Sequence, residues 1–448
     1  MGPLYSTFVW FIAGSIIFAT AQSMSMLIVG RVLQGVGAGG LDVLSEIILV
    51  DMTTLQERPL YLAIFAIPLA GGAILGPIMG ALFSQYAGWR WLGWVNLPIS
   101  ALNLALIVTF MRLKPIKSAL NEKLRRLDWI GMILFAIGST SFASPLSWAG
   151  MMYPWKSWQT LLPLFVGLGI IVVFGLYENG RLGAAPAEPI FPMRIFNNST
   201  AAVTLVNSFC HGAVIYAGIF YMPLMFQAVF LEAPLRSAVS MLPLCCTSVG
   251  FSIIAGVAVD KWRKYRWGII VSWVMSAIGC GLMALWKLDS SLAVTSGIQV
   301  LIGIGVGPCF VLLVLPIQAS LVNVNDSGIA AGMLVCFRLF GALVSLAICS
   351  TVFSSVFMGH ITSLGQLPES VAILKDVREA IGFIPSLRVV EISPIMMTGT
   401  VDAYRKAMVA VFMMLAGFAL VGFMTSFFVK EISIESDELG RQQMVEQK

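Results

Sequence analysis

Apolar residues gather in windows that recur along the chain, with short polar segments between them. A helix of roughly 20 apolar residues is long enough to cross the hydrocarbon core of a bilayer. The pattern therefore predicts an all-α polytopic membrane protein with about twelve transmembrane helices. The predicted spans are residues 4–22, 27–50, 61–84, 92–111, 129–148, 159–177, 200–226, 237–259, 267–286, 294–317, 329–357 and 406–429.

Two polar segments divide these spans into groups. RLKPIKSALNEKLRRLD (112–128) follows the fourth span, and GRLGAAPAEPIFPMR (180–194) follows the sixth. The prolines and alanines of the second segment suit an extended connector. We predict an incomplete N-terminal bundle of four spans, a linker with two extra spans, a C-terminal bundle of six spans and a cytosolic tail. Their bounds are 1–112, 113–180, 181–430 and 431–448.

The composition agrees with insertion into a membrane. Of the 448 residues, 58% are hydrophobic and 11% are charged, and the mean hydropathy is +0.90; soluble domains carry about 25% charged residues. The two histidines and the seven cysteines, which fall in apolar stretches, predict neither a metal site nor a disulfide framework. The sequence contains no GxxxxGKS or GxxxxGKT motif, which argues against a bound nucleotide. No catalytic set stands out, so we expect no enzyme, no cofactor and no nucleic-acid partner.

Lysine and arginine residues are concentrated in alternate loops. Short loops rich in these residues face the cytosol, so both termini are expected to be cytosolic and residues 359–404 form a long outer loop. We expect the plasma membrane, with the vacuolar membrane as the alternative. The inner loops carry Arg58, Arg112, Lys114, Lys117, Lys123, Arg125, Arg126, Arg181, Arg194, Lys261, Arg263, Lys264 and Arg266, and the short outer loops carry Arg90, Lys156, Arg236 and Lys287.

The second span contains ionisable residues, which are costly inside lipid. On a helix, Arg31, Asp42 and Glu46 fall in one stripe, and Gln34 lies at its edge. Ionisable residues inside a span mark ion or substrate pathways by default, so the stripe predicts proton coupling. The alternative places Asp42 and Glu46 near the cytosolic interface, where they anchor the helix end or pair with Arg58.

The seventh span carries a second set of polar candidates. His211 is either a hydrogen-bonded packing residue or a proton relay, since histidine titrates near working pH. Asn207, Tyr216 and Tyr221 lie on the same span. Because an apolar cavity with a few polar groups suits amphipathic compounds, these three residues are candidates to line a substrate pathway.

Two glycine-rich segments carry a resemblance to a known family. LIVGRVLQGVGAG (27–39) resembles the fourth-helix motif of drug:proton antiporters in the major facilitator superfamily. GAILGPIMGA (72–81) is similar to the antiporter motif of their fifth helix, although Ala81 stands where the family usually has glycine. WRWLGWVNLP (89–98) and LDWIG (127–131) are similar to the fourteen-helix branch, which is common among fungal multidrug and toxin efflux pumps.

The resemblance assigns further roles. Gly72, Gly76 and Gly80 form one smooth face for close helix packing, and Pro77 permits a bend. Gln318 and Arg338 match family positions in the substrate pathway. Arg338 lies in an apolar span and needs a buried partner or water; the alternative is a structural ion pair. GVAVDKWRKYR (256–266) resembles the C-half copy of the inner-loop gating motif and supplies the gate candidates Asp260, Lys261, Arg263 and Lys264, for which a positive-inside anchor is the alternative.

The match begins at the family's third helix. The first two helices of the family, and the loop with its Asp–Arg gating motif, have no counterpart in the chain, which therefore has a truncated fourteen-helix pattern. Either the protein starts upstream of Met1, or the chain is a truncated transporter.

The resemblance implies a secondary active transporter. We expect proton-coupled export of small amphipathic organic compounds, such as drugs, toxins or secondary metabolites, by alternating access between two bundles. The expected partners are a small-molecule substrate, protons and the lipid bilayer. One alternative is proton-coupled uptake of a small solute, and another is an inactive or non-transporting remnant.

Overall fold

The computed structural model describes residues 2–111, 125, 127–150, 152–183, 186 and 188–435. Residues 112–124 and 126 of the first polar segment, residues 184, 185 and 187 of the second, and the predicted tail from residue 436 lie outside the described residues.

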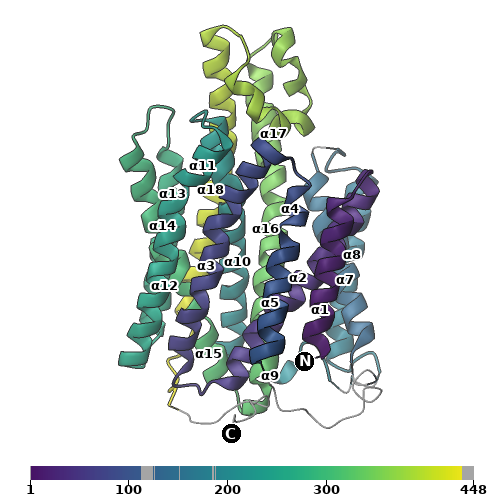
Figure 1. Ribbon diagram of the computed structural model, residues 1–448, viewed down its shortest axis with the longest axis vertical. Coiled ribbons are helices and arrows are strands. Elements are labelled where there is room, and N and C mark those ends of the chain that lie inside the picture. Colours follow the sequence, from purple (N-terminus) through teal and green to yellow (C-terminus); the bar gives the residue numbers. More distant parts are fainter. Residues whose placement is uncertain are drawn as a thin grey trace.

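Long helices run side by side along the molecule and make up most of the described chain (Figure 1). Twelve helical segments of the described chain are long and apolar enough to cross a membrane, which confirms the predicted fold class and number of spans. They are α1 (Gly2–Ala19), α2 (Met24–Met52), α3 (Arg58–Leu82, continued by a π-helical turn at Phe83–Ala87), α4 and α5 (Trp91–Trp94 and Asn96–Phe110), α7 (Trp129–Trp148), α8 (Trp158–Glu178), α10 (Ser199–Ala228), α11 and α12 (Pro234–Ser240 and Leu242–Trp262), α13 (Arg266–Leu282, continued by a 3-10 turn at Met283–Leu285), α14 and α15 (Leu292–Leu312 and Val314–Ala319), α16 (Ser327–Ser363) and α18 (Pro394–Ser426).

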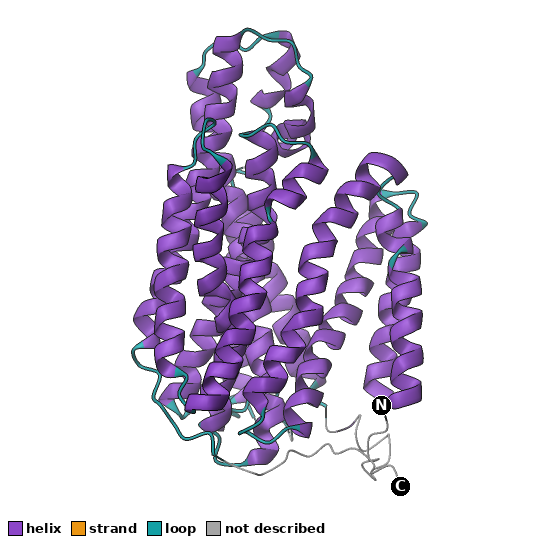
Figure 2. Cartoon of the chain, turned by 60° about the vertical axis from the view of Figure 1, so that its left-hand side comes forward, coloured by secondary structure: helices purple, strands orange, loops and turns teal. Residues whose placement is uncertain are grey.

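The start of α1 and the C-terminal end of α18, which is yellow in Figure 1, lie at the same end of the helices, as an even number of spans requires. Figure 2 shows the N-terminus at this end from another side. We call this the terminus end. The segment 364–393 projects at the opposite end, which we call the loop end (Figure 1). The short helix α9 (Met193–Phe196) precedes α10 at the terminus end.

The last two long helices extend further than their hydrophobic pattern predicts. The predicted spans are 329–357 and 406–429, whereas α16 ends at Ser363 and α18 begins at Pro394. With 37 residues, α16 is about 55 Å long, compared with about 30 Å for the hydrocarbon core. The difference arises because hydropathy marks only the part of a helix that lipid would cover.

The segment between these helices is a folded cap rather than an open loop. It consists of 3-10 turns and the four-residue helix α17 (Ala380–Phe383). Its apolar side chains Val371, Leu374, Ile384 and Leu387 are buried. The hydroxyl of Tyr404, on α18, donates to the carbonyl of Ala380 at 2.5 Å, so the cap is held against the extended part of α18.

Helix backbones approach each other closely at glycines, both between α1 and α2 and within the C-terminal half. A Cβ atom at Gly212, on α10, would overlap the backbone of Arg338, on α16, and one at Gly341 would overlap the backbone of Phe209. Small residues let helices approach in this way where lipid gives no hydrophobic drive for association. In the same half, Ser252 of α12 donates to the carbonyl of Gly307 on α14 at 2.6 Å.

The third helix packs against the C-terminal half. A Cβ atom at Gly256, on α12, would lie 2.6 Å from both the Cβ of Ala63 and the carbonyl oxygen of Pro59, on α3. In contrast, α1 packs closely on α2. The extra helices α7 and α8 pack on each other, and α7 also contacts α16, where Thr351 donates to the carbonyl of Leu146.

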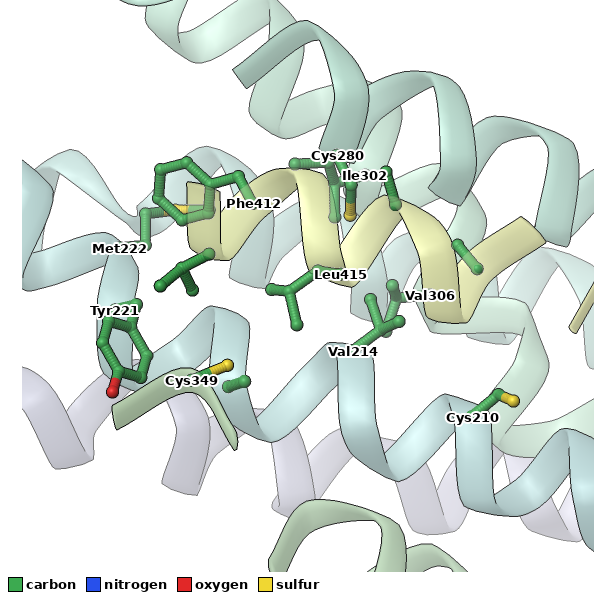
Figure 3. Packing of buried hydrophobic residues seen from close by; sticks show 14 of the residues in the cluster. Cys210, Val214, Tyr221, Met222, Cys280, Ile302, Val306, Cys349, Phe412 and Leu415 are labelled. Atoms are coloured by element: carbon green, nitrogen blue, oxygen red, sulfur yellow. The ribbon is translucent and has the colours of Figure 1, made fainter. Parts of the chain in front are cut away.

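The core of the C-terminal half combines apolar side chains from α10, α14 and α18. Figure 3 shows Val214, Val306 and Leu415 pointing toward one another from these three helices. Val214, Val306 and Leu415 are each at most 3% exposed. The three side chains also line a cavity. This part of the cavity wall is therefore formed by well-packed core residues.

Candidate transport pathway

A cavity of about 440 Å³ lies between α3 and the C-terminal helices. Its volume falls in the range of about 300–1,000 Å³ that is typical of small-molecule sites. The wall is mostly apolar, and His211, Tyr216, Ser248, Ser252 and Arg338 supply most of its polar groups. An enclosure of this kind fits an organic compound with a large apolar part.

A buried ion pair connects the cavity wall to α2 through Arg338. Arg338 Nη2, on α16, lies 2.8 Å from Glu46 Oε2, on α2, and the two side chains are 4% and 1% exposed. The guanidinium of Arg338 also lies 4.4 Å from the ring centroid of Phe310. The second carboxylate oxygen of Glu46 has no hydrogen-bond partner among the described residues. Breaking such a pair leaves an uncompensated charge in a dry site, which is strongly unfavourable.

The position of Glu46 differs from the interfacial alternative raised by the sequence. Glu46 pairs with Arg338 inside the helical bundle, whereas Arg58 donates to Gln318 and to the carbonyls of Val50 and Thr53. Asp42, one helical turn before Glu46, is half-buried, and its charge acts on Arg338 as well. Both carboxylates predicted for proton coupling therefore lie near the same guanidinium.

The first half of the polar stripe on α2 lies elsewhere. Arg31 donates to Gln34 at 3.3 Å and stacks over the ring of Phe18 at 4.0 Å. Gln34 donates to Ser15 at 2.9 Å. Ser15 and Phe18 belong to α1, so Gln34, a predicted pathway residue, is buried between α1 and α2 and is outside the cavity wall.

The predicted residues of α10 divide into two sets. His211 and Tyr216 line the cavity, and His211 Nε2 donates to the carbonyl of Val306 at 3.0 Å. Asn207 instead donates to Thr425 at 3.1 Å. The ring centroid of Tyr221 lies 6.4 Å from that of Phe353 in the core. Asn207 and Tyr221 therefore contact neighbouring helices and do not line the cavity.

The antiporter motif does not pack closely in this conformation. Gly72 lines the cavity, and Pro77 lies inside α3. A Cβ atom at Gly72, Gly76 or Gly80 would meet no atom within 4 Å among the described residues. The expectation of a tight packing face is therefore not met here. The physical reason is that α3 approaches α12 closely near Ala63, at the terminus end, and the motif lies further along α3.

Polar contacts join the N-terminal and C-terminal halves at the terminus end, and we call these contacts the closure. Arg263, which ends α12 with a left-handed backbone (φ 55°), donates to the carbonyl of Gln56 at 2.6 Å and lies 3.5 Å from Asp260. Of the four predicted gate residues, Asp260 and Arg263 are therefore joined to each other, and Arg263 joins α12 to the α2–α3 loop. Lys261 and Lys264 are exposed.

A further contact brings together Arg58 and Gln318. Arg58 is 2% exposed and donates to Gln318 Oε1 at 3.2 Å. Gln318 in turn donates to the carbonyl of Ser327 at 3.0 Å. Gln318, a predicted pathway residue, thus belongs to the closure at the terminus end and not to the cavity wall.

The chain after α18 is fixed to the same end. Glu431 accepts hydrogen bonds from the backbone N–H groups of Tyr265 and Arg266, at 2.9 and 3.0 Å. These groups start α13, where a carboxylate is favoured by unsatisfied N–H groups. The hydroxyl of Tyr265 donates to the carbonyl of Lys430 at 3.1 Å, and burial raises the pKa of this tyrosine to about 12. The hydroxyl therefore stays protonated and keeps this contact at physiological pH.

Sequence reasoning missed several members of the site. The sequence predicts a buried partner for Arg338 and marks Glu46 as ionisable, but it does not pair them, because 292 residues separate them. Charge complementarity between two costly groups in apolar spans is the signal that would have linked them. Phe310 and the interior role of Arg58 carry no comparable local signal.

The chain matches a known protein family over most of its length. The model of the Major Facilitator Superfamily matches residues 4–346. The chain belongs to the Major Facilitator Superfamily. The predicted resemblance to this superfamily is thereby confirmed, and membrane transport is the activity that the family supports.

Fungal transporters resemble this superfamily member over most of its length. The MFS-type transporter sphD of Aspergillus fumigatus is 45% identical over 447 residues, which are 99% of this chain and 76% of that protein. The efflux pump FUS6 of Gibberella fujikuroi is 34% identical over 436 residues, which are 96% of this chain and 77% of that protein.

Solved structures support the fold. A bacterial homologue of the human lysosomal transporter Spinster, in an inward-facing and occupied conformation, matches with a TM-score of 0.55 at 15% identity. The match covers 95% of this chain and 82% of that chain. The human organic anion transporter MFSD10 matches with a TM-score of 0.52 at 13% identity, over 94% of this chain and 76% of that chain. At such low identity these likenesses concern the fold alone.

Proposed function

We propose that this protein exports small amphipathic organic compounds in exchange for protons, by alternating access. The observation that carries the proposal is the buried Glu46–Arg338 pair, which joins α2 to α16 at the edge of an apolar cavity. An ionisable pair at such a place can link protonation to helix contact. The names of the relatives, which include efflux pumps, favour the outward direction.

In the proposed cycle, protonation loosens the contact between α2 and α16. A proton on Glu46 removes the negative charge that compensates Arg338, and the buried arginine then needs another partner. Asp42 is close enough to share this role, since its charge also acts on Arg338. Arg31 interacts with Gln34 and Phe18, so we assign it to the positioning of α2 against α1.

The contacts at the terminus end complete the proposed cycle. Arg263 to Gln56 and Arg58 to Gln318 both join segments that must separate if the cavity is to open at this end. The excess of lysine and arginine in the loops at the terminus end supports a cytosolic location for this end. This conformation is therefore the one that is closed toward the cytosol, in the plasma membrane or, as the alternative, the vacuolar membrane.

The test uses purified full chain in proteoliposomes with an imposed pH gradient. Flux of a panel of fluorescent amphipathic compounds is measured for the native chain, Glu46→Gln, Asp42→Asn and the control Asp376→Asn. We expect gradient-dependent export that Glu46→Gln and Asp42→Asn abolish and the control leaves intact. Export that persists in both carboxylate variants would overturn the proposed coupling, and flux in the direction of the proton gradient would replace export by uptake.

The control residue lies outside the membrane-spanning helices. Asp376 is a half-buried member of the cap at the loop end and pairs with Arg378. Hydrogen bonding by Arg378 lowers the pKa of Asp376 to about 2. Its carboxylate is thus ionised at the pH values of the assay. Asp376→Asn removes one negative charge, as Glu46→Gln and Asp42→Asn do, but at a position away from the cavity.

A further inference from the structure

The cavity wall contains one fixed charge. Among the described residues that line it, Arg338 is the only lysine or arginine, and the wall includes no aspartate or glutamate. The remaining lining residues are largely aliphatic and aromatic, for example Leu69, Ile219, Met222 and Phe310. A charged ligand that enters therefore meets a positive group in apolar surroundings.

We infer that Arg338 binds the acidic group of an amphipathic anion, such as a carboxylate, and that Glu46 competes with the ligand for the same guanidinium. This inference names the substrate class for the cavity of the proposed function and therefore rests on it. Arginine has five N–H donors in a planar fork that matches a carboxylate. The contact with Glu46 occupies Nη2 alone.

The surroundings of Arg338 select against other ligands. Phe310 covers a face of the guanidinium at 4.4 Å, so an anion approaches along the edge, where the donors lie. A cationic ligand finds no carboxylate among the lining residues, because Glu46 lies behind Arg338 and is engaged by it. A neutral ligand gains the apolar contacts but not the charge-assisted hydrogen bonds, which are about twice as strong as neutral ones.

Charge balance explains why Glu46 and the ligand exclude each other. Glu46 contacts the guanidinium directly, and Asp42 acts on it from one helical turn away. A further carboxylate at the same place would add a buried negative charge without compensation. When Glu46 is neutral, the ligand anion takes its place. By linkage, any change that removes the charge of Glu46 must strengthen binding of the anion, and the bound anion must favour neutral Glu46.

The test is equilibrium binding to the full chain in nanodiscs, without a proton gradient. The probes share one aromatic body and differ in the head group: 1-naphthaleneacetate, 1-naphthaleneacetamide and 2-(1-naphthyl)ethylamine. We expect the carboxylate to bind about tenfold more tightly than the amide, because the gain per charge-assisted hydrogen bond is near the value that corresponds to tenfold. The amine should bind more weakly than the amide.

Two variants distinguish the effect of the charges of Glu46 and Arg338 from the effect of the shape of the cavity. Glu46→Gln should tighten binding of the carboxylate about tenfold and leave the amide unchanged. The double variant Glu46→Gln/Arg338→Gln should bind carboxylate and amide equally, and Asp376→Asn should match the native chain. Correct folding is checked for each by gel filtration and by binding of the amide.

The outcomes distinguish this inference from the transport proposal. Equal affinities for the three probes, or a carboxylate that binds no better to Glu46→Gln, would overturn the inference even if flux is proton-coupled. The expected binding pattern in a chain that shows no gradient-dependent flux would support the anion site and count against the exporter.

Discussion

Arg58 and Gln318 form a hydrogen bond of 3.2 Å between residues 260 positions apart in the sequence. Arg58 begins α3 and Gln318 lies on α15, so the bond connects the N-terminal half to the C-terminal half at the terminus end. Arg58 also donates to two carbonyls of the α2 end, those of Val50 and Thr53. One buried side chain thus holds three segments together.

A charge on Gln318 should strengthen this closure. Gln318→Glu converts the neutral acceptor into a carboxylate beside Arg58, and charge-assisted hydrogen bonds are about twice as strong as neutral ones. The substitution also removes the donor to the Ser327 carbonyl, but that bond joins two segments of the C-terminal half and does not cross between the halves. We expect the state closed at the terminus end to gain about 1 kcal/mol and transport to slow roughly fivefold. Flux in proteoliposomes checks this, with alkylation of Cys245, a cavity residue, from the terminus end as a second readout.

The matched control is the same substitution at an exposed position. Gln85→Glu, in the π-helical turn at the loop end, changes the charge equally but touches no contact at the terminus end. It should leave both the flux and the alkylation rate at native values. Faster alkylation of Cys245 in Gln318→Glu would contradict the assignment of Gln318 to the closure.

The Glu46–Arg338 pair predicts a second, thermodynamic result. Arg338→Met leaves Glu46 charged, buried and unpaired, which should cost about 3–5 kcal/mol of stability. The double variant Arg338→Met/Glu46→Leu removes both charges and should recover most of that loss, because an apolar pair needs no compensation. Thermal unfolding of the purified chain measures both. A double variant that is as unstable as Arg338→Met would show that the pair stabilises the fold through more than charge balance.

The number and type of the helices follow from hydropathy alone, since each span must be apolar over a fixed thickness. The partners of the polar residues do not. Asp42 and Glu46 lie on the stripe that the 3.6-residue period predicts, but Arg31 on the same stripe turns toward Phe18 of α1. A periodicity argument gives the face of one helix, and only the arrangement of neighbouring helices decides what that face meets.

The same limit explains the pathway candidates. Tyr216 and Tyr221 are close in sequence on α10, yet Tyr216 lines the cavity and Tyr221 packs against Phe353. Both are aromatic residues with one hydroxyl group, so residue type does not separate them. Five positions along an α-helix correspond to a rotation of about 140°, so the two rings leave α10 on different faces. The helices packed against α10 decide what each face meets.

The glycines of this protein predict a third result. Gly212→Ala puts a Cβ atom into the backbone of Arg338 and should destabilise the chain by about 1–3 kcal/mol. Gly76→Ala meets nothing within 4 Å and removes a flexible residue from a helix, so its stability should be unchanged or up to about 1 kcal/mol higher.

For Gly76→Ala, we expect the flux to fall although the stability does not. If the motif face of α3 packs only when the terminus end opens, Gly76→Ala should lower flux at least fivefold while its thermal unfolding stays native or better. A comparison of melting temperature and flux for the two alanine variants checks this. Native flux in Gly76→Ala would mean that the motif face stays unpacked throughout the cycle.

His211 offers the last prediction, because its two candidate roles respond differently to substitution. Its Nε2–H donates to the carbonyl of Val306, which links α10 to α14. A glutamine side chain also ends in an N–H donor, so His211→Gln should keep this link, the native stability and the native pH profile of transport. His211→Leu should leave the Val306 carbonyl without its partner and cost about 1–3 kcal/mol. Thermal unfolding and flux as a function of pH test both variants together. A His211→Gln chain that folds normally but loses the pH dependence of flux would make His211 a proton relay, since glutamine supplies the hydrogen bond but does not titrate.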